Sequence, residues 1–143
     1  MAKCDIQMPD EFLARLKNLG DREDEIAEAA LKAGGEVVLS KVQASLSGAV
    51  GHGTKNPSRS TGRLAAALAL SRVKTDRNGD HNIKVGFSEP RSGGGSNAKL
   101  ANILEYGKHG QPAKPFLKPA KAASKAAAIS AMQKKLQEEV EKL

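Results

Sequence analysis

One glycine-rich segment carries some of the residues of a phosphate-binding loop. It reads Gly48-Ala49-Val50-Gly51-His52-Gly53-Thr54-Lys55. Nucleotide-binding loops of this kind follow a strand and place their lysine directly before a serine or threonine, so that the ammonium group reaches the phosphates and the hydroxyl reaches Mg²⁺. Here Thr54 precedes Lys55, and the segment follows residues with helical spacing. The pattern therefore favours a loop without nucleotide chemistry.

The other candidates for metal or catalytic chemistry are isolated from one another. The histidines and the single cysteine are His52, His81, His109 and Cys4. None has a second ligand at the spacing of a zinc site, and no serine lies in a nucleophile-elbow pattern. Glu105, directly before Tyr106 and Gly107, is the one acid in a distinctive setting, and we expect it to form hydrogen bonds or ion pairs. We predict no catalytic residues, no metal, no cofactor and no enzyme activity.

The net charge of +7 is unevenly distributed along the chain. Residues 1–50 hold six Lys or Arg and nine Asp or Glu, a balance of −3, whereas residues 51–143 hold seventeen and seven, a balance of +10. Four lysines at 4-3-4 spacing form a basic face wherever this segment is helical: Lys114, Lys118, Lys121 and Lys125. That face is either solvated or in contact with phosphate or an acidic partner. The opposite signs favour head-to-tail self-association and DNA binding equally.

Periodicity and capping signals predict a mostly helical chain. The alternation over residues 3–8 predicts a short strand, and helices are expected over 9–20, 21–50, about 61–68, 97–107 and from about Pro119 onward. Ser60 or Thr61 is the expected cap of the short helix, and Asn97 that of the fourth. In the long helix, Gly34-Gly35 predicts either a bend or the close approach of another backbone. In the last helix the expected apolar stripe is Ile129, Met132, Leu136, Val140 and Leu143.

Residues 69–88 change to a period of two, which is typical of strands. Leu70, Arg72 and Lys74 alternate with their neighbours, as do Ile83, Val85 and Phe87, and Asn78-Gly79 lies between the two runs. Asn-Gly between alternating segments is the strongest short hairpin signal. A lone hairpin is marginal in water, so we expect the N-terminal strand or a neighbouring chain to widen the sheet.

Together these elements predict one α+β domain over residues 1–143. A small antiparallel sheet, made of the β-hairpin and the N-terminal strand, would pack against a long helix and a C-terminal helix. The core should be thin, because twenty-two residues are alanine and only four are aromatic. The lone cysteine and the absence of a signal or membrane-spanning pattern indicate a soluble, cytoplasmically made protein. We expect a mobile loop over 48–60, exposing Lys55 and Arg59, and a flexible connection over 90–96.

A resemblance to a known family rests on the residues before the last helix. Asn102-Ile103-Leu104-Glu105-Tyr106-Gly107 is followed by Gln111-Pro112-Ala113-Lys114-Pro115-Phe116-Leu117-Lys118-Pro119-Ala120, and Thr61-Gly62-Arg63-Leu64 follows the polar loop. These segments resemble the small tail-component family of siphophages and prophages typified by gene product ten of phage HK97. The likeness extends over nearly the whole chain, and Lys108 departs from it where a threonine is frequent.

The resemblance implies a structural virion protein of a tailed phage or prophage. It would be a neck or tail-completion component that forms a homo-oligomeric ring at the head–tail junction, located in the virion neck or tail and, during assembly, in the host cytoplasm. Its partners would be copies of itself and other phage connector and tail proteins, with non-specific contact with packaged DNA and no membrane. The expected subunit or partner contacts are Glu105, Tyr106, Gly107, Gln111, Pro112, Pro115, Phe116, Leu117 and Pro119. The alternative is a small basic DNA-binding protein, although no stacking aromatic or base-reading motif accompanies the lysines.

The proline-framed Phe116 has two expected placements. Pro112, Pro115 and Pro119 each fix φ near −65° and bias the preceding residue toward extended geometry, which stiffens the segment. Phe116 would then fill either the core of its own subunit or a pocket on the adjacent one. The thin core and the nearby Leu104 and Tyr106 favour its own core.

Overall fold

The computed structural model describes residues 10–50, 62–89 and 95–143. The elements in chain order are α1 (Asp10–Asp21), α2 (Glu23–Ala49), α3 (Arg63–Ala67), β1 (Leu68–Leu70), β2 (Lys74–Thr75), β3 (His81–Asn82), β4 (Val85–Phe87), α4 (Asn97–Tyr106) and α5 (Leu117–Glu141). The fold is α+β, as the sequence predicts. The expected N-terminal strand, Lys55 and Arg59 of the expected mobile loop, and most of the connection over 90–96 lie outside the described residues.

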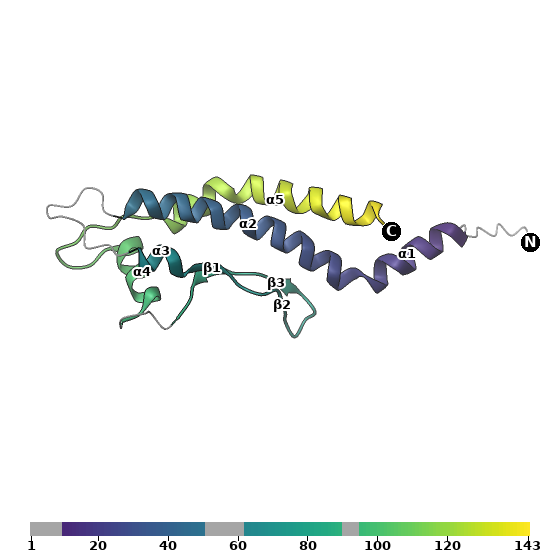
Figure 1. Cartoon of the computed structure of the whole chain (residues 1–143), viewed down its shortest axis with the longest axis horizontal. Helices are drawn as coiled ribbons and strands as arrows, with labels where there is room; N and C mark the ends of the chain where they lie inside the picture. The colour runs from purple at the N-terminus through teal and green to yellow at the C-terminus, as the bar shows by residue number, and fades with distance from the viewer. Residues whose placement is uncertain (1–9, 51–61, 90–94) are drawn as a thin grey trace, which may run out of the picture.

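The two long helices, α2 and α5, form the spine of the molecule. They run antiparallel and side by side (Figure 1), and they make the largest set of contacts between described elements. The spine is tightly packed at Gly34 of α2, where an added Cβ would lie 2.5 Å from Cγ of Met132 and 3.4 Å from the carbonyl oxygen of Ala128. Of the two outcomes expected for the glycine pair, the structure therefore has the close approach of another element.

The buried face of α5 differs from the predicted stripe. Small side chains four residues apart face α2, since Ala120, Ser124 and Ala128 are all buried. Ile129 and Leu136, two members of the predicted stripe, are 42% and 45% exposed. The small residues Ala120, Ser124 and Ala128 allow the two helices to lie close together, and Met132, a member of the predicted stripe, occupies the space beside Gly34. The predicted stripe is therefore confirmed at Met132 and wrong at Ile129 and Leu136.

Residues 68–87 form the predicted hairpin, in two separate ladders. β1 pairs antiparallel with β4, Leu68 opposite Phe87, and β2 pairs with β3, Lys74 opposite Asn82. At the tip, the Asp76 side chain accepts hydrogen bonds from the amides of Asn78 and Asp80, and Gly79 takes a φ of +85°. The Asn-Gly signal thus marked the turn correctly.

The hairpin covers the spine at the second glycine of the pair. A Cβ on Gly35 would lie 2.7 Å from Cδ1 of Leu70 and 3.5 Å from Cδ1 of Ile83. One diglycine step therefore receives α5 through Gly34 and the hairpin through Gly35. This double approach fixes how the three layers sit on one another.

The hydrophobic core lies toward the end of the spine where α4 packs. Its buried members are Val42, Leu46, Leu68, Ala101, Phe116 and Ala120. Phe116 is completely buried, and its ring meets that of Phe87 edge to face, with centroids 6.1 Å apart at 71°. The core is thin, in keeping with the alanine-rich composition, and its central residue comes from the proline-framed segment.

Three predicted helix boundaries need correction. α3 follows Gly62, whose φ is +76°, and ends at Ala67, so that Leu68 belongs to β1 rather than to the helix. Ser96, not Asn97, caps α4, its hydroxyl accepting from the amide of Lys99 at 3.3 Å. Asn97 is buried instead, and its Nδ2 donates to the carbonyl oxygen of Ser88 at 2.7 Å.

The start of α5 also differs from the prediction. The helix begins at Leu117, two residues before the expected position at Pro119. Pro119 is thereby in the first turn, where a missing amide proton costs nothing because no intrahelical acceptor exists there.

The diglycine packing can be tested by adding a side chain at each of three glycines of α2. We expect Gly34→Val and Gly35→Val each to lower the free energy of unfolding by about 1–3 kcal/mol, because the new atoms overlap Met132 or Leu70. Gly48→Val is the matched control, since nothing lies within 4 Å of its Cβ position. It should change stability by less than about 0.5 kcal/mol in urea denaturation. Equal effects at all three positions would contradict the close approach.

Candidate functional site

The most distinctive polar interaction of the described residues is made by Glu105. Its carboxylate accepts hydrogen bonds from the backbone amides of Phe116 at 2.8 Å, Leu117 at 2.9 Å and Lys118 at 3.0 Å. These are the first amides of α5, which have no acceptor within the helix. Pro119 follows and has no amide proton. A side chain from the end of α4 therefore caps the whole first turn of α5.

The chain between the two helices is folded so that this cap can form. Gly107, with a φ of +77°, ends α4, and a Cβ there would lie 2.8 Å from the amide nitrogen of Ala113. Lys108 and Gln111 then exchange two backbone hydrogen bonds, of 3.0 and 2.9 Å, and the amide of Lys114 donates to the carbonyl oxygen of Leu104 at 2.7 Å. This reversal returns the chain alongside α4 and delivers Phe116 to the core.

The environment of Glu105 sets the charge state of its carboxyl group. Burial alone raises its pKa, but the three amide hydrogen bonds together outweigh burial and, with the nearby Lys118 ammonium, hold the pKa below its ordinary value. The carboxylate is also at the positive end of the α5 dipole, which favours the ionised form. The expectation that Glu105 serves as a hydrogen-bonding group is confirmed by these contacts.

The expected contact residues separate into two groups. Glu105, Gly107 and Phe116 hold the chain's own fold together, and Phe116 fills its own core rather than a pocket elsewhere. The exposed members are Tyr106, Pro112, Pro115 and Pro119, while Gln111 and Leu117 are half-buried. Tyr106 is 79% exposed, so its ring does not contribute to the core that Phe116 fills. Its place after the capping residue turns its ring outward, and its contact with a partner stays a prediction.

The predicted basic face is shorter than four lysines. Lys114 precedes α5 and is half-buried, whereas Lys118, Lys121 and Lys125 are exposed on the first turns of the helix. Lys114, the first lysine of the 4-3-4 pattern, is therefore outside the helix, and only the other three lysines can share a helical face.

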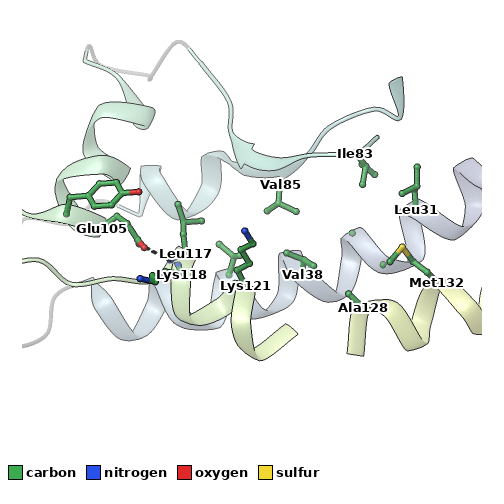
Figure 2. A pocket seen from close by; sticks show the side chains of 14 residues that line it. Leu31, Val38, Ile83, Val85, Glu105, Leu117, Lys118, Lys121, Ala128 and Met132 are labelled. Carbon is green, nitrogen blue, oxygen red and sulfur yellow. Dashed lines mark hydrogen bonds between the residues drawn. The ribbon is translucent and has the colours of Figure 1, made fainter. Parts of the chain in front are cut away.

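A groove of about 720 Å³ opens between the spine and the hairpin. Figure 2 shows Leu31 and Met132 toward one end, Val38 and Val85 in the middle, and Glu105 with Lys118 at the other end. The apolar walls come from α2, the hairpin and α5, and the polar end comes from α4 and the start of α5. Sequence reasoning missed this groove. The only signal for it was the diglycine step, since removing two side chains from α2 leaves room beside them.

The described residues offer no metal site, since no three His, Cys, Asp or Glu side chains are grouped as metal ligands. Within the same residues, no helix combines the length and apolar character that crossing a membrane requires.

One protein-family model matches most of the chain. Residues 10–107 match the family described as "Bacteriophage HK97-gp10, putative tail-component", from the first residue of α1 to the glycine that ends α4. The chain belongs to this family. No curated protein and no solved structure matches it.

Membership in the HK97-gp10-like family makes the protein a structural component of a phage tail, and hence of the virion. The matched residues include α1, the spine helix α2, the hairpin and Glu105. The proline-marked run from Gln111 to Ala120, which carried most of the resemblance, follows the matched residues. The match thus includes Thr61–Leu64 and Asn102–Gly107 of the resemblance, together with helices α1 and α2 and the hairpin.

The Glu105 cap can be tested through its pH dependence. We expect Glu105→Gln to lower the free energy of unfolding at pH 7 by about 1–3 kcal/mol, because an amide cannot accept from all three buried donors. The folded-state pKa is lowered, so the carboxylate's stabilisation is complete above the unfolded value of about 4.3 and disappears as pH falls through the folded value. The difference between wild type and variant should therefore shrink in denaturation below pH 4.

Glu28→Gln is the matched control for that experiment. Glu28 is exposed and pairs with Lys32 four residues along α2, at 2.7 Å. Surface pairs of this kind contribute about 0.3–0.5 kcal/mol. A loss at Glu105 no larger than the loss at Glu28 would contradict the capping role.

A second experiment compares the two aromatic residues of the segment. Phe116→Ala should lower the free energy of unfolding of the isolated subunit by about 3–5 kcal/mol, since the ring is fully buried. Tyr106→Ala, which removes an exposed ring, should leave the melting temperature nearly unchanged. Thermal melting followed by circular dichroism measures both, and an unchanged melting temperature for Phe116→Ala would contradict the core placement.

Proposed function

We propose that this tail component forms a homo-oligomeric ring at the head–tail junction, as a neck or tail-completion protein without enzyme activity. The observation that carries the proposal is the open apolar groove, because aliphatic side chains such as Val38, Ile83 and Val85 line a surface that the described residues leave uncovered. Large uncovered apolar surfaces mark sites of association. In the virion the partners would be neighbouring copies together with connector and tail proteins, and the subunits would meet them after synthesis in the host cytoplasm.

The charge distribution supports a head-to-tail arrangement. The first fifty residues are net acidic and the rest are net basic, so the acidic part of one copy is complementary to the basic part of the next. Contacts between two different surfaces of the same chain build rings when the rotation closes. Tyr106, Pro112 and Pro115, exposed beside the groove or on the turn before α5, are the motif residues that we assign to such contacts.

The exposed lysines of α5 give the ring a further surface. Lys118, Lys121 and Lys125 lie on the first turns of the helix. None of the three forms an ion pair with a carboxylate of the described residues. Such a cationic surface favours phosphate in a sequence-independent way. We assign it to acidic partner surfaces and to non-specific contact with packaged DNA passing the junction.

Sedimentation velocity over a range up to high micromolar concentration tests self-association. We expect concentration-dependent oligomers, or recruitment of the subunit to purified tails or connectors that lack it, since weak ring contacts often require a template. A chain that remains monomeric and is not recruited would overturn the proposal. Nanomolar binding to duplex DNA with a steep salt dependence, in the absence of self-association and recruitment, would instead support a small basic DNA-binding protein.

A further inference from the structure

Helix α1 extends from the rest of the described structure with two of its leucines exposed. Figure 1 shows it continuing past the end of α5, and Leu13 and Leu16 are 48% and 45% exposed. An isolated helix of twelve residues is at the limit of stability in water, and most helices gain their stability by packing an apolar face. An exposed amphipathic helix of this length therefore requires a surface to pack on.

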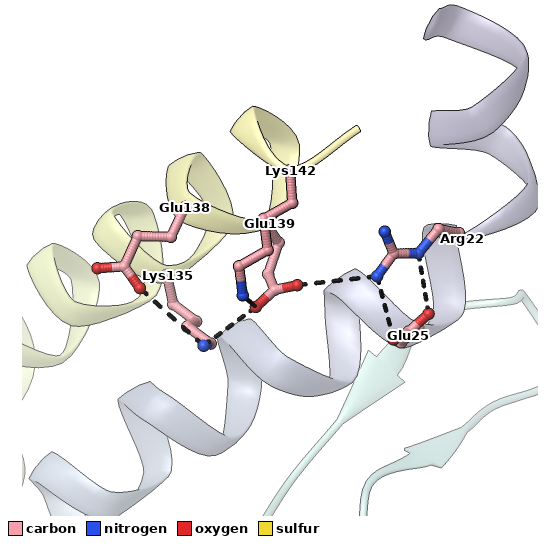
Figure 3. A network of polar contacts seen from close by, with 6 residues as sticks. All are labelled: Arg22, Glu25, Lys135, Glu138, Glu139 and Lys142. Atoms are coloured by element: carbon pink, nitrogen blue, oxygen red, sulfur yellow. Dashed lines mark hydrogen bonds and ion pairs between the residues drawn. The ribbon is translucent and has the colours of Figure 1, made fainter.

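The junction between α1 and α2 directs α1 away from its own groove. Backbone hydrogen bonds cross the junction, from the amide of Arg22 to the carbonyl of Asn18 at 3.2 Å and from the amide of Ile26 to the carbonyl of Arg22 at 3.0 Å. The Arg22 side chain pairs with Glu25 at 3.0 Å and reaches Glu139 of α5 at 4.0 Å (Figure 3). Folding α1 back along α2 would break these helical bonds.

The C-terminal end of α5 supplies the other half of this junction, through Glu139. Glu139 is buried and also accepts from Lys135 and Lys142, each at 3.0 Å. Hydrogen bonds from Lys142 and Lys135 hold the pKa of the Glu139 carboxyl below its ordinary value, so it stays ionised at neutral pH. The direction of α1 is therefore tied to the spine by a network of charges (Figure 3).

We infer that α1 of a second copy of the chain lies in the groove between the spine and the hairpin. The groove is walled by aliphatic side chains along its length, including Leu31, Val38 and Val85, and it ends at Lys118 and Lys121 (Figure 2). A helix with one apolar face fits a surface of this kind. Because α1 cannot turn back onto its own groove without breaking the junction, the groove that it fills belongs to a neighbour.

Charge sets the direction in which the arriving helix lies. α1 begins with Asp10 and Glu11, and among the described residues the lysines that line the groove are Lys118 and Lys121. The Glu105 carboxylate beside them is already engaged by three backbone amides. The N-terminal end of α1 therefore lies at the Lys118 end, and Leu13 and Leu16 then lie over the aliphatic middle. This inference rests on the proposed ring, for which it supplies the contact: each subunit gives a helix to one neighbour and receives a helix from the other.

The first test removes the apolar face of α1. Leu13→Asp combined with Leu16→Asp should weaken self-association, or incorporation into tails, by at least about 100-fold, because two buried leucines are lost from the interface. Ala14→Asp combined with Asn18→Asp is the matched control, since it adds the same charge to exposed positions on the opposite face of α1. The control should associate within about threefold of wild type. Wild-type association by the leucine variant would overturn the inference and leave the ring proposal standing.

The second test uses complementation between two defective subunits. Tyr106→Asp combined with Lys121→Glu alters the groove at exposed positions. Lys41→Glu combined with Gln43→Asp is the matched control, since it makes the same change in charge at exposed positions of α2 outside the groove lining. The leucine variant retains an intact groove and the groove variant retains an intact α1. An equimolar mixture should therefore form a one-to-one complex and nothing larger, although each variant alone is monomeric. A mixture that stays monomeric would overturn the inference, including the case in which α1 closes on its own chain.

A cross-link tests the orientation of α1. In a Cys4→Ser background, Glu11→Cys and Lys121→Cys placed on different subunits should form an intermolecular disulfide on mild oxidation, whereas Glu11→Cys with Lys125→Cys should form far less. Equal cross-linking at both lysine positions would contradict the stated direction. If the wild-type chain neither associates nor joins tails, the proposed ring itself is wrong. If the leucine variant still forms the ring, only the inferred contact through α1 is wrong.

Discussion

The cap that Glu105 places on α5 is the interaction on which the rest of the structure depends. The amides that begin a helix must find acceptors when they are removed from water. Here they begin a helix at a phenylalanine in the centre of the core, and the hydrogen bond of the Phe116 amide is buried. One ionised carboxylate satisfies all three, and Pro119 removes the need for a fourth acceptor. Because that carboxylate comes from the end of α4, the cap also joins α4 to the spine.

The second constraint is the diglycine step of α2. In an isolated helix two glycines cost about 2 kcal/mol relative to alanine, and here they are retained where α5 and the hairpin both approach the helix. At Gly34 the missing side chain admits Met132 of α5, while along the same helix Ala120, Ser124 and Ala128 are buried and Ile129 and Leu136 are exposed. The hairpin rests on Gly35 through Leu70, and the groove lies between these two contacts.

These two constraints build a subunit whose core is small and whose apolar surface is incompletely buried by the described residues. A phage tail component of this family works within an assembly, and a chain with few large side chains can complete its burial there. In the arrangement that we infer, the exposed leucines of α1 of one copy pack into the aliphatic groove of the next copy. Charges that fix the direction of α1 keep the two halves from combining in the same chain.

The sequence by itself determined the local structure. Asn78-Gly79 marked the hairpin turn, periodicity and capping signals placed the first two helices to within a few residues, and the segments around Glu105 and Phe116 suggested the family to which the chain belongs. These features depend on neighbours in the chain, so their residues are enough to specify them. The tertiary structure decided which faces are buried: it selected Ala120, Ser124 and Ala128 over the larger stripe, turned Tyr106 outward, and made Glu105 a cap for a helix eleven residues away. Such choices depend on which backbones can approach one another and on where unpaired amides fall, and neither is visible in residue spacing because both are set by segments distant in the chain.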